Sequence, residues 1–312
     1  MIKTETKQLK KFLILSTIVI LFALVLSINY TLTFALDNSA TLSNSSGITN
    51  QGFSDEKIRL EQFSNFVTSK LNETISTLQV ASENHILNNF DYKANVSEVL
   101  HGLPNDMEKS KRDFLSDIIK SNPDIASIFL VLPNGNIYLG EPFSDQKQLP
   151  RLNFADREWY KGVNLKDGLY VSTVFSSAAI NAPAIAVAIP IINSQSNGTS
   201  IQYNGVQSDK AGYLVAIMDF NYTRELLFKN SDNTNDTFNL VDRNGTELIN
   251  SNNSTYSTDL KSFYYKSIIN SDKNLKTNKK YEFNDEQGTK FIYLMPVTIT
   301  GNTWYMVMIS PR

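Results

Sequence analysis

The chain has 312 residues, of which 41% are hydrophobic and 19% are charged, and its formal net charge is -2. This composition is typical of a folded protein with one large or two modest globular units. No excess of basic residues exists to hold phosphates, which excludes nucleic acid as a partner. The absence of cysteine excludes disulfide bonds, thiolate metal sites and a cysteine nucleophile.

The N-terminal part of the chain predicts a membrane anchor. Residues 12–36 open with an apolar run from Phe12 to Ile28, and a helix of roughly 17–25 residues spans a bilayer. Lysines precede this run, and Asp37 is the first charge after it. The positive-inside rule then places residues 1–11 in the cytoplasm and residues from about 37 onward outside a cell membrane crossed once. The alternative is a cleaved signal peptide ending near Ala35, although its apolar region would exceed the roughly 7–15 residues usual for such peptides.

The composition of the following residues agrees with export. Residues 37–53 are rich in Ser, Asn and Gly and predict a linker or stalk. Ten Asn-x-Ser/Thr sequons, the pattern of N-glycosylation acceptors, occur in the chain. They lie at Asn29, Asn44, Asn72, Asn95, Asn197, Asn221, Asn235, Asn244, Asn252 and Asn253.

Two helices are predicted next. From Ser54 onward, apolar residues recur with three-and-four spacing, which indicates a long amphipathic helix with Ser54 as its N-cap. These apolar residues are Phe63, Phe66, Val67, Leu71, Ile75, Leu78 and Ile86. A second helix is predicted from about Asn105 to Lys120, and Asn122-Pro123 ends it.

Beyond Pro123 the pattern changes to strands, and it occurs twice. The hairpin sequence LVLPNGNIYL (130–139) matches LVDRNGTELI (240–249), each with an Asn-Gly turn between apolar runs. Apolar strands ending at a proline follow in both halves (184–191 and 291–297), and the closing strands (213–219 and 305–310) also correspond. We interpret this repeat as two related antiparallel-sheet modules that meet near residues 222–229.

No catalytic or metal-binding pattern is present. The two histidines, His85 and His101, form no ligand pair, and the chain has no Gly-rich phosphate loop and no G-x-S-x-G motif. We therefore predict neither an enzyme nor a metal site nor a cofactor.

The segment from Asn153 to Lys161 is the best candidate for binding, because it holds Arg157, Trp159 and Tyr160 within four positions. A guanidinium offers a planar set of donors suited to a carboxylate. Tryptophan and tyrosine supply flat apolar walls with a polar tip. The residue types alone leave a second interpretation open, in which the aromatic residues belong to the core and Arg157 is a surface ion-pair partner.

This segment (DREWYK), together with YVSTVF (170–175) and APAIAVAIPI (182–191), resembles the membrane-distal module of the double Cache family of extracellular sensor domains. The resemblance covers residues 54–312. It implies an α+β fold, in which a long N-terminal helix precedes two tandem PAS-like antiparallel-sheet modules. Residues 54–220 would form the long helix and the membrane-distal module. Residues 221–312 would form a linker helix and the membrane-proximal module.

The resemblance also implies site residues. Arg157 and Trp159 would grip a ligand carboxylate, with Tyr160 beside them, and Asp219 would hold a ligand amino group. Two family tyrosines are replaced here by Leu152 and Phe175, and Phe175 keeps the aromatic wall without the hydroxyl. These replacements argue against a standard amino acid and leave a carboxylate or amine-bearing metabolite.

We thus predict a sensor domain in signal transduction that binds a small polar metabolite in its membrane-distal module. A homodimer through the long helix, or a separate signalling partner, would carry the output, since no kinase, cyclase or second membrane helix follows Arg312. Either a truncated receptor or a stand-alone sensor fits this ending. The alternative function is a glycosylated structural or adhesive surface protein without a defined ligand.

Overall fold

The computed structural model describes residues 48–166, 168–192, 201–203, 206–208, 210–228, 236–251, 268–269, 279–285, 288–299 and 302–311. The chain divides into residues 1–52 and a larger unit of residues 53–312, to which the fold below belongs. The predicted cytoplasmic segment (1–11) and anchor (12–36) lie outside the described residues. Within the ranges given, no helix is long and apolar enough to span a membrane.

Both predicted helices exist, but they begin elsewhere. Helix α2 (Ile48–Ser82) already includes Ser54, so the predicted N-cap was wrong. Serine is favourable at a helix start but is also tolerated inside a helix, so it does not end a helix that begins earlier in the sequence. Helix α3 (Lys109–Ser121) begins after Asn105 because Glu108 adopts a left-handed conformation, with φ 56°, which a right-handed helix cannot continue through.

The first sheet is antiparallel and has the strand order β2-β1-β8-β5-β3, with β4 also paired to β5. Its strands are β1 (Ile125–Val131), β2 (Ile137–Glu141), β3 (Tyr170–Val171), β4 (Phe175–Ser177), β5 (Ala182–Ile192) and β8 (Lys210–Met218). The short helices α4 (Phe143–Gln148) and α5 (Glu158–Lys166) lie between these strands in the sequence, and β6 (Ile201–Tyr203) pairs with β7 (Val206–Ser208).

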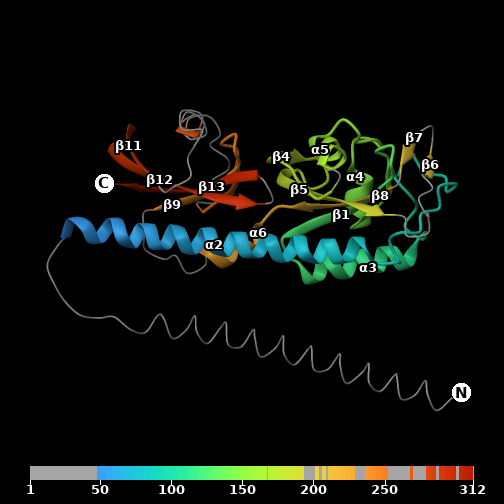
Figure 1. The fold of residues 1–312 in the computed structure, drawn as a ribbon, viewed down its shortest axis with the longest axis horizontal. Coiled ribbons are helices and arrows are strands. Elements are labelled where there is room, and N and C mark those ends of the chain that lie inside the picture. Colours follow the sequence, from blue (N-terminus) through green and yellow to red (C-terminus); the bar gives the residue numbers. More distant parts are fainter. Residues whose placement is uncertain are drawn as a thin grey trace, which may run out of the picture. The chain divides into compact units, whose positions relative to one another are not determined.

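The second sheet is also antiparallel and has the order β10-β9-β13-β12-β11. Helix α6 (Asn221–Phe228) precedes it, as Figure 1 shows. Its strands are β9 (Thr237–Val241), β10 (Glu247–Asn250), β11 (Lys279–Asp285), β12 (Gly288–Ile299) and β13 (Asn302–Pro311).

The strand registers confirm the internal repeat. In the first sheet, Tyr213 pairs with Val131 on one side and with Pro190 on the other. In the second sheet, Tyr305 pairs with Val241 and with Pro296 in the same way. The two Asn-Gly turns have glycines at φ 87° and 73°, values that favour glycine. Two sheets with one strand order and one register are therefore built from the two halves of the repeat.

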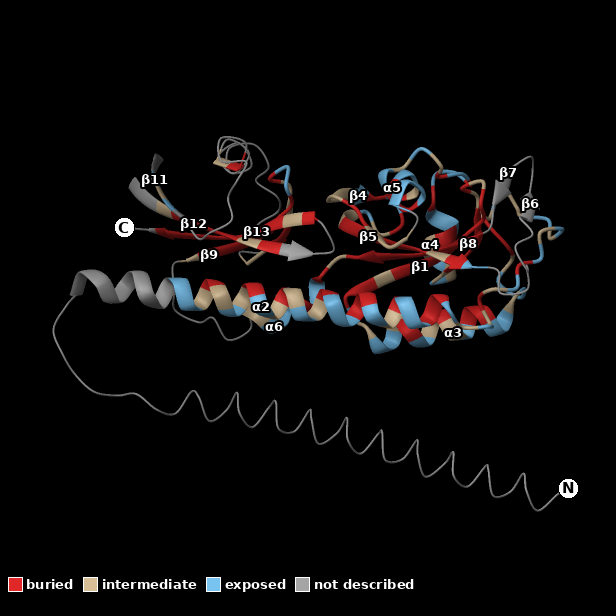
Figure 2. Cartoon of the chain, viewed as in Figure 1, coloured by how far each residue is buried: buried red, intermediate tan, exposed pale blue. Residues whose placement is uncertain are grey.

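The two faces of the first sheet have different partners. Side chains alternate across a strand, so Leu214 and Met218 of β8 face a core that includes Val67 and Leu71 of α2. Val215 and Ile217 face the opposite way, toward a second core that contains residues of the segment around α5. The inward stripe of α2 is buried, as Figure 2 shows. The chain is thus an α+β protein in which α2 supports one face of the sheet and the candidate site lies on the other.

Candidate ligand-binding site

The first Asn-Gly hairpin positions the segment that leads into the site. The Ile137 amide donates a hydrogen bond to the Leu152 carbonyl (3.0 Å), and the Phe154 amide donates one to the Gly135 carbonyl (2.9 Å). The approach is close: a Cβ atom on Gly135 would lie 2.7 Å from the Cβ of Ala155. The hairpin and this segment therefore fix where Phe154 enters the core.

Helix α5 then turns its apolar side toward the sheet. Trp159 and Val163, one helical turn apart, are both buried in the second core. The alanines of β5 at positions 184, 186 and 188 are on the same face of the sheet. Their small side chains leave space above the sheet for the indole and for the residues around it.

A pocket lies between α5, β4 and the sheet. It encloses about 430 Å³ including its open mouth, with about 40 Å³ of room for the centre of a water molecule. Pockets for small ligands are commonly about 300–1,000 Å³, so the room inside this one fits only a small group of a ligand unless the surrounding side chains move. It is lined by Phe129, Ile137, Leu149, Phe154, Arg157, Trp159, Phe175, Ser177, Ala178, Ala179, Val215 and Ile217.

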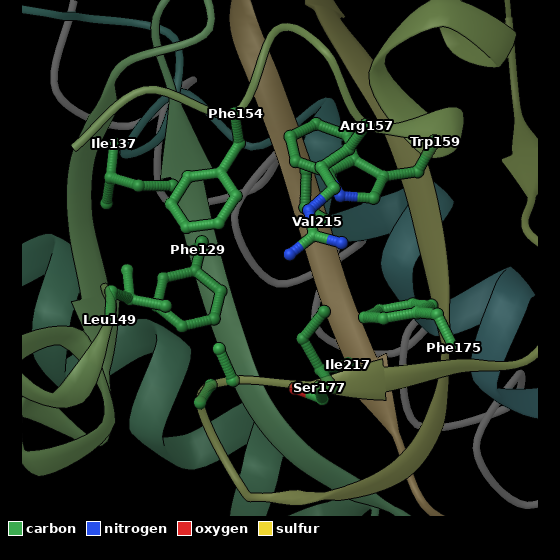
Figure 3. A pocket seen from close by; sticks show the side chains of 12 residues that line it. Phe129, Ile137, Leu149, Phe154, Arg157, Trp159, Phe175, Ser177, Val215 and Ile217 are labelled. Carbon is green, nitrogen blue, oxygen red and sulfur yellow. The ribbon is translucent and has the colours of Figure 1, made fainter. Parts of the chain in front are cut away.

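Arg157 supplies the charge in this pocket. Figure 3 shows its side chain reaching into the pocket among the rings of Phe154, Trp159 and Phe175. The guanidinium carbon lies 5.9 Å from the centre of the Phe154 ring. Among the residues that the structure describes, no side chain or carbonyl accepts a hydrogen bond or forms an ion pair with this guanidinium. A half-buried cation whose donors are free of protein partners is suited to an anionic ligand.

Tyr160 is engaged by the scaffold and does not line the pocket. Its hydroxyl donates a hydrogen bond to the Pro133 carbonyl at 2.5 Å. Its ring meets Trp159 edge-on at 5.9 Å and Tyr213 at 5.5 Å. Burial raises the pKa of the Tyr160 hydroxyl, with a further contribution from Tyr213. Tyr160 thus holds the Trp159 ring in place from behind.

Asp219 also lies outside the lining of the pocket. It follows the end of β8 at Met218, and its carboxylate accepts hydrogen bonds from the backbone amide (3.0 Å) and the side-chain amide (2.5 Å) of Asn221. Burial raises the pKa of Asp219, against the effect of these hydrogen bonds. On β8 the side chains that do line the pocket are Val215 and Ile217.

The two positions that depart from the family pattern lie in different places. Leu152 is buried in the core next to the pocket, and Phe175 lines the pocket itself. Several apolar lining residues, among them Phe129 and Ile217, were not predicted from the sequence. Strand alternation was the available signal, because it places every second residue of β1 and β8 on the face that carries the site.

Glu158, between Arg157 and Trp159, points away from the pocket. It accepts hydrogen bonds from the Tyr170 hydroxyl (2.7 Å) and from the hydroxyl and amide of Thr173, and Arg243 of the second sheet's hairpin lies 3.8 Å away. Burial would raise the pKa of Glu158, but these hydrogen bonds and the Arg243 charge lower it overall. The Glu158 carboxylate is therefore hydrogen-bonded to the segment that leads into β4.

Two further hydrogen bonds tie this segment to the second sheet. The Val174 amide donates to Oδ2 of Asp242 (3.0 Å), and the Asn302 side-chain amide donates to the Val171 carbonyl (2.5 Å). Val174 directly precedes Phe175, which lines the pocket, and Val171 lies four residues before it. One wall of the pocket is thus in contact with the second sheet through its neighbours in the chain.

No metal centre accompanies this pocket: within the described part of the chain, no group of three or more His, Cys, Asp or Glu side chains is arranged to hold an ion.

Comparison with solved structures shows the same fold. The ligand-binding domain of the amino acid chemoreceptor PctB of Pseudomonas aeruginosa PAO1, in complex with L-Gln, is 14% identical with a TM-score of 0.56, and the match covers 81% of this chain and 88% of that one. The extracellular domain of the histidine kinase rpHK1S-Z16 gives a TM-score of 0.60 at 11% identity, covering 85% and 97%.

An extracellular ligand-binding receptor from Desulfohalobium retbaense DSM5692 gives a TM-score of 0.58 at 11% identity, and this chain spans 40% of its length. No curated protein matches the chain in sequence. The family model described as Cache domain matches residues 41–312. That match covers most of the chain and includes both sheets, so the chain belongs to the double Cache family of ligand-binding sensor domains.

Proposed function

We propose that this chain is an extracytoplasmic sensor domain that binds a small polar metabolite, amino-acid-like, amine or carboxylate, in the pocket on the first sheet. One observation carries the proposal: the Arg157 guanidinium reaches into an otherwise apolar pocket and has no partner among the described residues. An uncompensated cation in such a place is unfavourable unless solvent or a ligand satisfies it. Trp159 and Phe175 would form the walls beside the bound group.

The chain would be exported and held at the cell membrane. Residues 12–36 would anchor the chain, with residues from about 37 onward outside the membrane. Residues 54–220 would act as the membrane-distal, ligand-binding module and residues 221–312 as the membrane-proximal module. The relatives described above are extracellular domains of receptors, which supports this arrangement.

A route for the signal follows from the contacts around Phe175. Its neighbour Val174 is bonded to Asp242 of the second sheet, and Glu158, next to Arg157, lies beside Arg243. A ligand that moves the Arg157 or Phe175 side chain would therefore change the contact with the second sheet. Helix α2 packs against both sheets. Its Leu71 lies in the core under the first sheet, and the ring of its Phe63 lies 4.5 Å from that of Phe238 in β9. The helix would therefore carry the change along its axis to a dimer or signalling partner.

The test is calorimetric titration of the purified full chain, in detergent, with a panel of small metabolites. We expect at least one carboxylate to bind, and Arg157→Ala to weaken its binding roughly 10- to 100-fold, since hydrogen bonds to charged groups contribute about 1.5–3 kcal/mol. The matched control is Lys161→Ala, an exposed cation of α5 four residues after Arg157 that does not line the pocket, and it should bind as the wild type does. Binding that survives Arg157→Ala unchanged would mean that the pocket is wrongly assigned. A chain that binds nothing and self-associates instead would favour an adhesive surface protein.

A further inference from the structure

Among the residues that the structure describes, those that line the pocket include a cation but no anion to balance it. Arg157 is the charged residue among those that line it, and the other lining side chains are apolar apart from Ser177. From this imbalance, and resting on the proposed function, we infer that the pocket selects a small organic carboxylate with an apolar body and no ammonium group beside the carboxylate. Amino acids would then be poor ligands of this member of the family.

The carboxylates nearest to the site in the chain all have partners elsewhere. Asp156 is paired with Arg151 at the surface (2.5 Å). Glu158 accepts hydrogen bonds from Tyr170 and Thr173. Asp219, expected to hold an amino group, accepts two hydrogen bonds from Asn221. To reach an ammonium group in the pocket, each of these side chains would first have to give up hydrogen bonds or an ion pair, at a cost comparable to the interaction gained.

The pocket wall on β8 is hydrocarbon. Val215 and Ile217 point into the site, and Ile217 is 5% exposed. Asp219 follows two residues later, beyond the last residue of the strand, Met218. On the face of the sheet that carries the pocket, the last residue of β8 is therefore Ile217, a branched apolar side chain. It favours the apolar body of a ligand and cannot pair with a cation.

The consequence for an amino acid is electrostatic. If the carboxylate of the amino acid pairs with Arg157, its ammonium group is held close to the guanidinium, and the two like charges repel each other. No carboxylate among the described lining residues compensates for this repulsion. The same molecule without the ammonium group keeps the charge-assisted hydrogen bonds and buries its apolar body against Phe175 and Ile217. The pocket therefore distinguishes two ligands that differ by one substituent.

The experiment uses matched pairs of probes with the full chain in detergent, followed by calorimetry. The pairs are 3-methylbutanoate with L-valine and 3-phenylpropanoate with L-phenylalanine, and 3-methylbutanamide and 3-phenylpropanamide serve as the uncharged controls. At least one acid should bind at least about tenfold more tightly than its amino acid, since a single lost charge-assisted interaction is of that order. In Arg157→Gln, that acid should lose its advantage over its neutral amide, while Lys161→Gln should change nothing.

Tighter binding of an amino acid than of its deaminated partner would overturn the inference, and if that binding still required Arg157, the proposed function would stand. Weaker amino acid binding in Asp219→Asn would also overturn it, because Asp219 would then be the missing anion. If neither acid binds, the inference is overturned, and the wider metabolite panel described above decides the proposed function separately.

Discussion

One buried carboxylate, Asp242, contributes to the contact between the two sheets. Its Oδ1 accepts hydrogen bonds from the amides of Asn244 (2.8 Å) and Thr246 (2.9 Å), and its Oδ2 accepts one from Val174 (3.0 Å). The first hairpin has Leu132 at the equivalent position and closes its turn with the same backbone hydrogen bonds. The turn therefore does not need a carboxylate there, and Asp242 has a second role in holding the segment before Phe175.

We expect Asp242→Ala to lower the free energy of unfolding by about 2–4 kcal/mol. Three hydrogen bonds to a charged acceptor are lost, each contributing about 1.5–3 kcal/mol, but the exposed donor of Asn244 and the partly exposed donor of Thr246 regain water. For a unit of this size the melting temperature should fall by roughly 5–15 °C. In hydrogen exchange read by mass spectrometry, the Val174 amide should lose its protection.

The control is Asp91→Ala, in which an exposed carboxylate loses a local bond from the Lys93 amide. It should cost less than about 1 kcal/mol and leave exchange at Val174 unchanged. If the free energy of unfolding of Asp242→Ala is within about 0.5 kcal/mol of the wild-type value, or if the Val174 amide stays protected, Asp242 does not hold the two sheets together.

Two further predictions concern the surroundings of the site. Gly135→Ala should cost about 1–3 kcal/mol, because a Cβ there would be strained at φ 87° and would collide with Ala155, whereas Gly168→Ala, where the nearest atom is 3.8 Å away, should be nearly neutral in the same denaturant titration. Asp219→Asn should change the pH dependence of stability. Because the pKa of Asp219 is raised in the folded state, the folded wild type binds a proton more readily than the unfolded chain. The contribution of Asp219 to the stability of the wild type is therefore lost as pH rises from the ordinary pKa of 3.8 through the raised pKa. The difference in unfolding free energy should therefore move in favour of Asp219→Asn across that window, and a difference that stays constant with pH would contradict the assignment.

The repeated sheets could be predicted because their signals are local. An Asn-Gly pair between apolar runs requires a positive φ that glycine provides, and Gly135 and Gly245 both have it. The starts of the helices could not be predicted as well, since they depend on contacts distant in sequence. Glu108 takes a left-handed conformation while its carboxylate bonds to Tyr138 of β2 and Lys111, and no pattern within the helix reveals this.

The site was predictable where side chains lie close together in sequence, and less so elsewhere. Arg157, Trp159 and Phe175 line one pocket, and their role in binding stays a prediction. Asp219 was assigned from the family resemblance, but whether a residue faces the pocket depends on where the strand stops. The residues on β8 that reach the site are Ile217, two positions earlier, and Val215.

The central claim, that a ligand binds beside Arg157, has a direct optical test. The chain contains two tryptophans: Trp159 lines the pocket, and Trp304 is buried in the second sheet at 1% exposure. In a Trp304→Phe background, the emission of Trp159 should change saturably as a small carboxylate is titrated into the full chain, and Arg157→Ala should remove the change. A ligand that binds by calorimetry while the Trp159 emission stays constant, or changes equally in Arg157→Ala, would place the binding site elsewhere.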